Sequence, residues 1–406
     1  MADKQKKVTK PILLIIFGIF AFAVLIGSLC VKDRDFSNLE NRTLEFFHYP
    51  SVDTVWSGEW METFETYNLD QIMGRDLLVT ANSRLLRGLG RKQINGVTVC
   101  DGNVLLKDTN YSQVDKDFSG DFAQFMRANI RKAVGAANSY GGQVYYVNLY
   151  ERNVYFYDKY PYHKNECRED FDIANKARVK ALSEEGAIVV DTYETFKEHE
   201  DEYLYFNTDH HFTMKGAYYT YQELLKKINE NNPKRPALTY PGWDEMELVR
   251  PNRKFWGSIT TLLGDAKYGT NDFLEYALPS DFPWNGYERL EDGKPSDMPL
   301  VRDSEVEEYG WFMNGDYGNT VIRTHREELP NVLIIGYSMT DAIELMAVYN
   351  FNEMHSIDPR MFEGSIAEYI ANAKCDYVII VDQLEHEIKE NGRDPRQFKC
   401  RIWLEF

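Results

Sequence analysis

Ser338 stands where an apolar run gives way to a helical pattern. The run Val332–Gly336 precedes it, and residues 339–346 place apolar side chains at a spacing of three and four. This pattern predicts a strand-to-helix turn with the serine at the helix N-terminus, where free amides and the helix dipole favour negative charge. Such turns expose nucleophilic serines in α/β hydrolases. A serine there also serves as a simple N-cap, so the residues leave two interpretations, nucleophile or cap.

Asp209, His210 and His211 supply the residue types of a general base and its orienting carboxylate. In an extended segment, side chains two residues apart point the same way. The Asp209 carboxylate can therefore reach His211 Nδ1 and leave Nε2 free to act as a base. A structural hydrogen-bond cluster and a metal site are the other interpretations. Adjacent histidines point to opposite faces and no further His or Cys spacing supports an ion, which makes the metal site the least favoured of the three. The serine chemistry that we favour needs no metal and no cofactor.

Three groups at expected strand or helix ends are candidates for binding an oxyanion or substrate. Met339 follows the serine, Arg360 follows Asp358, and Gln383 ends the last predicted strand. Amides and cations in such places stabilise the negative charge that develops on a reacting carbonyl oxygen. Arg360 is equally well explained as an ion-pair partner of Asp358.

Five short apolar runs predict strands that are buried on both faces. They are Val144–Asn148, Ala187–Asp191, Val332–Gly336, Met354–Asp358 and Tyr377–Asp382. Helical patterns alternate with them, at Phe118–Ala137, Asp172–Ser183, Gly216–Asn229, Thr340–Val348 and Ser365–Ala373. The alternation predicts an α/β domain with a parallel sheet sandwiched by helices. Ligands of such sheets bind at the carboxyl ends of the strands, where the candidate residues fall.

Residues 12–31 form an uncharged and mostly apolar run, which predicts a transmembrane helix. The tail 1–11 carries four lysines against one acid, Asp3, which predicts a cytoplasmic N-terminus and an extracytoplasmic remainder. The expected protein is thus a single-pass protein of the cell membrane. A cleaved signal peptide and lipidation at Cys30 are the alternative interpretations.

The rest of the chain divides by composition. Residues 32–94 are expected to form a connector and a helical approach, with helical spacing from Trp56 to Leu89. Residues 95–406 are expected to form the α/β domain. At about 234–298 a stretch rich in Pro, Gly, Asp and aromatic residues predicts an insertion or lid. Its aromatic side chains either stack on sugar rings or form a local core.

Composition and charge exclude several classes of protein. The 406 residues include 46 basic and 64 acidic side chains, a formal net charge of −18, which excludes a general nucleic-acid binder. A hydrophobic content of 43% excludes wholesale disorder. Five scattered cysteines without a Cys-x-x-Cys motif argue against a disulfide scaffold or a cysteine-rich zinc module.

An ordered series of motifs resembles the DHHW protein family. Asp209–Phe212, followed by Thr213–Tyr218, is similar to the signature of that family. The other matching parts are Phe36–Leu44, Asn95–Val97, Phe255–Ser258, Tyr309–Asp316, the strand leading to Ser338, and Ile357–Arg360. The family is related to the alginate O-acetylation proteins and to other extracytoplasmic SGNH-hydrolase-like acetyltransferases. The resemblance covers nearly all of the chain after residue 31.

This resemblance implies an SGNH-hydrolase-like fold with Ser338 as nucleophile, His211 as base and Asp209 as its orienter. It implies O-acetyl transfer to hydroxyls of an extracytoplasmic polysaccharide or cell-envelope glycan, through an acetyl-serine. It also implies a membrane-bound O-acyltransferase partner that supplies the acetyl group. Phe212 departs from the usual tryptophan of the family, and Tyr337 stands where many members have aspartate. A glycan acetyl esterase, and a non-catalytic glycan-binding or scaffold subunit of an envelope acetylation complex, are the alternative functions.

Overall fold

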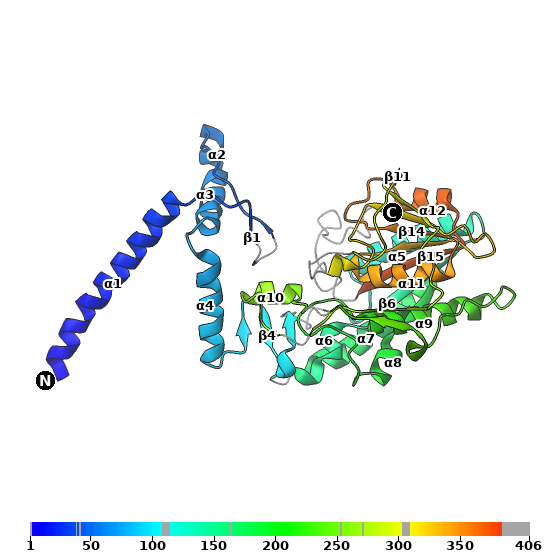
Figure 1. The fold of residues 1–406 in the computed structure, drawn as a ribbon, viewed down its shortest axis with the longest axis horizontal. Helices are drawn as coiled ribbons and strands as arrows, with labels where there is room; N and C mark the ends of the chain where they lie inside the picture. Colours follow the sequence, from blue (N-terminus) through cyan, green and yellow to red (C-terminus); the bar gives the residue numbers. More distant parts are fainter. Residues whose placement is uncertain are drawn as a thin grey trace. The chain divides into compact units, whose positions relative to one another are not determined.

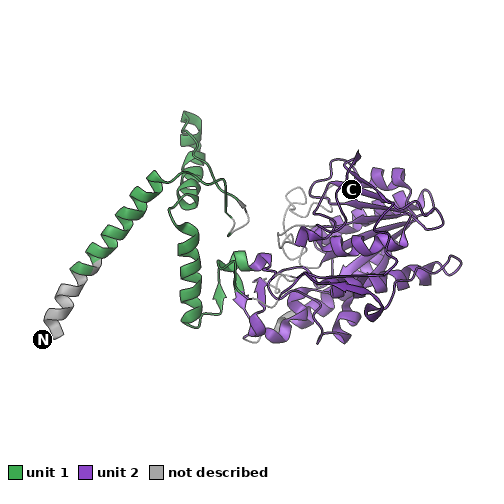
Figure 2. Ribbon diagram, in the orientation of Figure 1, with its two compact units in different colours: residues 1–97, 260–268 green, residues 98–259, 269–406 purple. Residues whose placement is uncertain are grey.

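The protein divides into two compact units, which Figure 2 shows in different colours. In this computed structural model the described residues are 2–37, 39, 42–107, 114–161, 165–251, 254–269, 272–302 and 309–383. The first unit comprises residues 1–97 and 260–268, and the second comprises residues 98–259 and 269–406. Asp209, His211 and Ser338 all belong to the second unit. Asn38, Glu40 and Asn41, which form part of one predicted motif, lie outside the described residues.

The first unit is mainly helical. Its elements are α1 (Ala2–Cys30), β1 (Phe36–Ser37), β2 (Arg42–Thr43), α2 (Val52–Ser57), α3 (Glu59–Asp70), α4 (Arg75–Gly88) and β3 (Gln93–Ile94). Helices α2 to α4 confirm the helical spacing between Trp56 and Leu89. Gly58, at φ 85°, ends α2 in the left-handed conformation that suits glycine. Asp265 of the segment 260–268 accepts hydrogen bonds from Arg84 and Arg87 of α4.

The predicted transmembrane helix is not supported by the structure. Residues 12–30 are helical and lie within α1, as the uncharged run suggested. Among the residues that the structure describes, however, no helix combines the length and the apolarity that crossing a bilayer requires.

The second unit is built on a mixed sheet, whereas we predicted a wholly parallel one. The strand order is β11-β10-β12-β14-β13-β15-β6-β7. The strands are β6 (Gln143–Leu149), β7 (Ile188–Asp191), β10 (Glu288–Glu291), β11 (Lys294–Pro295), β12 (Asn319–Arg323), β13 (Val332–Ile335), β14 (Glu353–Ile357) and β15 (Tyr377–Gln383). The five predicted strands are confirmed and run parallel in the order β14-β13-β15-β6-β7. The other three extend this parallel core with antiparallel pairings.

The antiparallel strands have a different sequence pattern from the parallel core, which explains the error. Strand β10 reads Glu-Arg-Leu-Glu, and β12 holds only two consecutive apolar residues, Val321 and Ile322. A search for continuous apolar runs therefore passes over both strands. The hairpin between β10 and β11 does carry a local signal, because Asp292 and Gly293 connect the strands with φ values of 47° and 76°. Asp-Gly favours this kind of two-residue hairpin turn.

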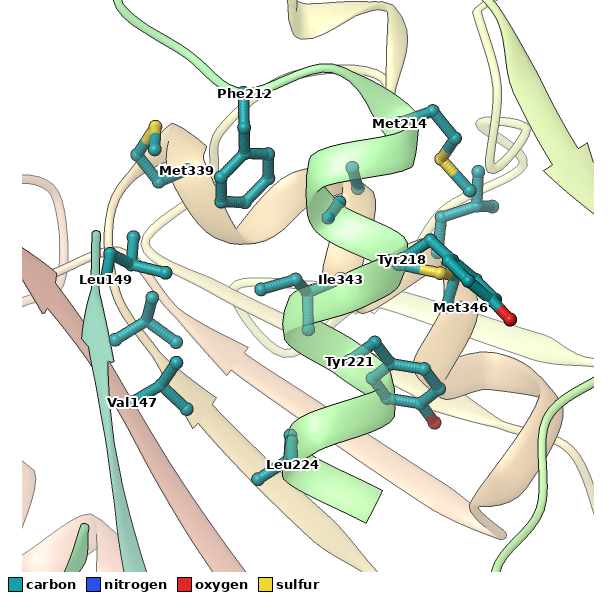
Figure 3. Packing of buried hydrophobic residues seen from close by; sticks show 14 of the residues in the cluster. Val147, Leu149, Phe212, Met214, Tyr218, Tyr221, Leu224, Met339, Ile343 and Met346 are labelled. Atoms are coloured by element: carbon teal, nitrogen blue, oxygen red, sulfur yellow. The ribbon is translucent and has the colours of Figure 1, made fainter. Parts of the chain in front are cut away.

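Helices cover both faces of the sheet, as the alternating pattern predicted (Figure 1). Helices α5 (Asp121–Asn138) and α12 (Ile366–Ala373) share one buried cluster, and α9 (Met214–Asn231) and α11 (Asp341–Asn350) share the other. Successive strand residues alternate between the clusters: Val147 packs with α9 and α11, whereas Tyr146 packs with α5. Figure 3 shows the cluster of α9 and α11, where side chains of both helices and of β6 pack together.

The remaining α-helices and strands of the described chain lie outside the main sheet and its two helix pairs. They are β4 (Val97–Val99), β5 (Leu105–Lys107), α6 (Arg152–Tyr155), α7 (Asn165–Glu184), α8 (Tyr193–Glu198), β8 (Glu247–Val249), α10 (Ser258–Leu263) and β9 (Tyr276–Leu278). The stretch 234–298, predicted as one insertion, contributes to several parts of the fold. Residues 288–295 join the main sheet, Phe255 and Phe282 belong to the core cluster of α9, and residues 260–268 belong to the first unit.

Candidate active site

A short loop before α9 carries Asp209 and His211. An antiparallel bridge between Tyr205 and Phe212 closes this loop, and the Phe206 N–H donates to the His211 carbonyl at 3.3 Å. Helix α9 begins directly afterwards, because Thr213 caps it by accepting a hydrogen bond from the Gly216 N–H at 3.3 Å. The loop is thus held between a bridge and a helix start, which fixes the backbone on both sides of the histidine.

Asp209 holds His211 through two contacts. His211 Nδ1 lies 2.5 Å from Asp209 Oδ1, and the His211 backbone N–H donates to the same oxygen at 3.0 Å. The Ser258 N–H donates to the other carboxylate oxygen at 2.6 Å. Burial opposes the charge of this carboxylate, yet the two neighbouring histidines and these hydrogen bonds hold the pKa of Asp209 well below its usual range. An ionised Asp209 therefore orients the imidazole.

Ser338 meets the free nitrogen of that imidazole. His211 Nε2 lies 2.7 Å from Ser338 Oγ, a hydrogen-bond distance. The serine opens a 3₁₀ turn, Ser338–Thr340, that leads from β13 into α11, so the predicted strand-to-helix turn is present. Gly336 makes this tight turn possible, because a Cβ at this position would lie 2.4 Å from Thr340 Cγ2. The structure thus brings all three predicted residues into one chain of hydrogen bonds.

The residues after the histidine and the serine anchor both to the same core. Phe212 and Met339 are buried in the cluster of Figure 3, at 0% and 7% exposure. Two segments that are more than a hundred residues apart are therefore held together by a shared apolar contact region. Phe212, which replaces the tryptophan expected from the family resemblance, keeps an aromatic ring at this point.

Asp209, His210 and His211 also form a group whose ligand atoms lie within 4.8 Å of one another. Two ligands of one tetrahedral ion, each about 2.0–2.1 Å from it, are roughly 3.3 Å apart. The 2.5 Å between Asp209 Oδ1 and His211 Nδ1 is too short for this and fits a hydrogen bond. His210 Nδ1 lies 3.0 Å from Ser258 Oγ. This geometry favours the hydrogen-bonded arrangement over the metal interpretation.

The structure separates the three candidates for binding an oxyanion. Met339 lies in the first turn after Tyr337, where backbone N–H groups have no intrahelical acceptor. Arg360 pairs with two carboxylates instead, because its Nε lies 3.0 Å from both oxygens of Asp358 and its Nη2 lies 2.6 Å from Asp316. Gln383 is the last residue of β15, in register with Leu149 of β6. The described contacts join neither Arg360 nor Gln383 to Ser338 or His211.

Asp272 holds the loop before His211 through hydrogen bonds, a role that the sequence did not suggest. Its Oδ1 accepts from the Asn207 N–H and the Asn207 side-chain amide, both at 2.9 Å, and from the Tyr203 hydroxyl at 2.6 Å. Its Oδ2 accepts from the Thr208 N–H at 2.7 Å and from the Thr208 hydroxyl at 2.5 Å. Asp272 is only 2% exposed. One buried carboxylate thus fixes the two residues that precede Asp209.

Arg152 holds the same loop through its carbonyl groups. Its guanidinium donates to the Phe206 carbonyl at 2.8 and 3.1 Å, to the Asn207 carbonyl at 2.7 Å and to the Leu105 carbonyl at 2.7 Å. Burial lowers the pKa of Arg152 below its usual value, and Asp209 and Asp272 oppose that shift. The only sequence signal was its place, three residues after the end of β6 and therefore near the carboxyl edge of the sheet.

Gly257 explains why the motif Phe255–Ser258 belongs to the site. A Cβ on this glycine would lie 2.3 Å from the Thr208 carbonyl and 2.4 Å from Asp209 Cβ. The Gly257 N–H donates to the Thr208 hydroxyl at 3.0 Å. Only a glycine lets this segment approach closely enough for the Ser258 amide to reach Asp209.

Comparisons with known proteins place the chain beside one family and several solved structures. The model of the family described as DHHW protein matches residues 180–238, which include Asp209–Phe212, and confirms the resemblance read from the motifs. No curated protein matches the chain. Among solved structures, Bacillus cereus PatB1 with a sulfonyl adduct is 19% identical with a TM-score of 0.58, covering 75% of this chain and 98% of that one. A DHHW family protein from Eubacterium siraeum is 18% identical with a TM-score of 0.54, covering 74% and 97%. At these identities the likeness shows a shared α/β fold.

Proposed function

We propose that this protein transfers acetyl groups to hydroxyls of a polysaccharide or cell-envelope glycan through an acetyl-serine on Ser338. The observation that carries the proposal is the unbroken series Asp209–His211–Ser338, with 2.5 Å and 2.7 Å between successive partners. A structural cap needs no histidine on the serine hydroxyl, and a buried histidine needs no ionised carboxylate behind it. Together these groups form the arrangement that activates a serine nucleophile.

In the first half-reaction His211 Nε2 takes the Ser338 hydroxyl proton while Oγ attacks the carbonyl carbon of the acetyl donor. The tetrahedral intermediate collapses to acetyl-Ser338, and the imidazolium returns the proton to the leaving group. Throughout, the Nδ1 proton stays on its hydrogen bond to Asp209, whose negative charge stabilises the imidazolium. We assign the binding of the developing oxyanion to the amides at the start of the 3₁₀ turn, including that of Met339.

In the second half-reaction a sugar hydroxyl replaces the leaving group. His211 Nε2 takes the proton of that hydroxyl as its oxygen attacks the acetyl-serine carbonyl. Collapse of the second tetrahedral intermediate gives the acetylated sugar and returns the proton to Ser338 Oγ. No other proton carrier is required, because the His211 imidazole takes the proton from Ser338 in the first half-reaction and returns a proton to Ser338 in the second.

The family resemblance supports the choice of substrate and partner. It points to an extracytoplasmic glycan as acceptor, and acetyl donors are scarce outside the cytoplasm. We therefore propose that a membrane-bound O-acyltransferase delivers the acetyl group to Ser338. The proposed place of action is the outer side of the cell membrane.

The test compares the acetyl content of the envelope glycan in wild-type, deletion and Ser338→Ala strains. Acetyl transfer predicts that the deletion and Ser338→Ala lose glycan acetylation alike, although the variant protein is present and folded. Removal of acetyl groups by the same three residues would instead raise the acetyl content in both strains. Normal acetylation in Ser338→Ala, with loss only on deletion, would leave a scaffold role.

A further inference from the structure

Tyr309 lies face to face with the imidazole of His211. The ring centroids are 3.7 Å apart and the two planes differ by only 4°. Each residue is only 5% exposed, so the stack is shielded from water. A contact this close and parallel leaves the imidazole little freedom to rotate, because tilting the ring would drive it into the phenol.

His210 approaches the same imidazole with its own ring. The centroids of His210 and His211 are 3.8 Å apart, with 37° between their planes, although we expected His210 to point away. Among the described ring contacts none joins Tyr309 to His210, so the two rings lie on different sides of His211. The base is therefore held between an aromatic phenol and a second imidazole.

The packing of Tyr309 shows which part of its side chain matters. Phe312 and Phe206 meet the phenol ring edge-on, at 5.2 and 6.1 Å between centroids. The buried Tyr309 hydroxyl, by contrast, has no hydrogen-bond partner within the described part of the chain. The ring is therefore fixed by apolar contacts, and its face is the feature that it presents to His211.

We propose that Tyr309 is a positioning residue for the proposed acetyl transfer. Its ring holds the His211 imidazole in line with Asp209 and Ser338, and its π-face stabilises the imidazolium that forms when His211 takes the serine proton. The face of an aromatic ring attracts a cation more strongly than it attracts a neutral ring. The stack therefore stabilises the His211 imidazolium more than the neutral imidazole of the resting enzyme. An interaction raises the rate only when it is stronger in the transition state than in the ground state, and this contact meets that condition. This inference rests on the proposed function, since only a proton-accepting His211 becomes charged.

The experiment follows acetylation of Ser338 by p-nitrophenyl acetate, measured as the burst of nitrophenolate and confirmed by the mass of the intact protein. Tyr309→Phe keeps the ring and should retain the acylation rate within about 3-fold. Tyr309→Leu removes the π-face and should lower the maximal acylation rate about 10- to 100-fold, with KM changed less than about 3-fold. Tyr309→Met, which is also flexible and apolar, takes its place if the leucine variant does not fold.

Phe351→Leu is the matched control, because Phe351 is a fully buried ring of the same core cluster at the far end of α11. It should lower the melting temperature about as much as Tyr309→Leu but leave the acylation rate unchanged. Equal rates in Tyr309→Leu and wild type would overturn the inference, as would equal losses of rate in Tyr309→Leu and Phe351→Leu. If wild type itself forms no acetyl-Ser338, the proposed function fails first, and the variants are not needed to show it.

Discussion

The two arms of the site are built in different ways. The serine arm, from Gly336 to Thr340, is a continuous turn between β13 and α11. The Thr340 N–H closes it by donating to the Tyr337 carbonyl at 2.8 Å, and the Gly336 N–H donates to the Ile357 carbonyl of the adjacent strand β14 at 3.2 Å. The histidine arm, the loop from Asn207 to His211, depends on groups from distant parts of the chain. Arg152 lies 55 residues before this loop and Asp272 lies 65 residues after it, each measured to Asn207.

The difference shows where each arm is vulnerable. A turn fixed by its own strand and helix persists as long as the core folds, because its hydrogen bonds form between near neighbours. A loop fixed by buried polar groups depends on every partner, because a buried donor or acceptor that loses its partner costs roughly 1–3 kcal/mol. We therefore expect substitutions that never touch the reacting atoms to damage the histidine arm more than the serine arm.

The sharpest test removes the link between the arms. Ser338→Ala and His211→Ala should each lower the rate of p-nitrophenyl acetate cleavage about 10⁴-fold or more, and the double variant should be hardly slower, because the two residues act as one unit. The measurement is the steady release of nitrophenolate by the three variants above the uncatalysed rate, with folding checked by circular dichroism. Multiplicative losses in the double variant would mean that the 2.7 Å contact is not used in catalysis.

The next test loosens the histidine arm alone. Asp272→Asn replaces an acceptor of five hydrogen bonds with a side chain that brings unwanted donors, so the loop should shift. We expect the acylation rate to fall about 10- to 100-fold and the free energy of unfolding to fall by about 2–4 kcal/mol. Denaturant titration and the burst assay measure the two effects.

Asp265→Asn provides the matched control for that variant. Asp265 is a buried carboxylate of the first unit that is hydrogen-bonded by Arg84 and Arg87. Its substitution should also lower the free energy of unfolding. It should leave the acylation rate within about 2-fold of wild type, because Asp265 forms none of the hydrogen bonds by which Asp272 holds the loop Asn207–His211. A normal rate in Asp272→Asn would show that the loop keeps its position without this carboxylate, against the comparison drawn above.

The smallest effect concerns the support of the serine arm. Glu344 of α11 accepts hydrogen bonds from the Thr340 hydroxyl and from the Ser356 hydroxyl at 2.7 Å, and burial raises the pKa of Glu344 to about 7. The folded protein therefore keeps a proton that the unfolded chain loses near pH 4.3. Stability should fall as pH rises from about 4 to 7, by at most about 3.7 kcal/mol, and change no further above that range.

Glu344→Gln isolates this contribution, because the amide retains an acceptor but has no proton to lose. Denaturant titrations of wild type and Glu344→Gln at pH 5, 6, 7 and 8 should show that the wild type loses stability relative to the variant between pH 5 and 7. A constant difference between the two proteins across this range would contradict a proton held by Glu344.

The sequence by itself determined the parallel core and the residues of the candidate site. Five short runs, four of them continuously apolar, became β6, β7, β13, β14 and β15, because strands buried on both faces need apolar side chains on both. The strand-to-helix turn placed Ser338 at a helix start, and a spacing of two let the Asp209 carboxylate reach His211. These features follow from local geometry, which one stretch of chain specifies without help from the rest.

Only the tertiary structure decided the edge strands and the supports of the histidine arm. Strands β10 and β12 carry polar residues and are specified by pairing with a neighbour, which no single segment encodes. Asp272, Arg152 and Tyr309 act across long sequence separations. Tyr309 opens one of the motifs of the family resemblance, but its neighbours in sequence do not indicate the contact with His211, and the same holds for the contacts of Asp272 and Arg152. Their roles come from folding, which buries them beside the loop, so that hydrogen bonds and ring contacts hold His211 against Ser338.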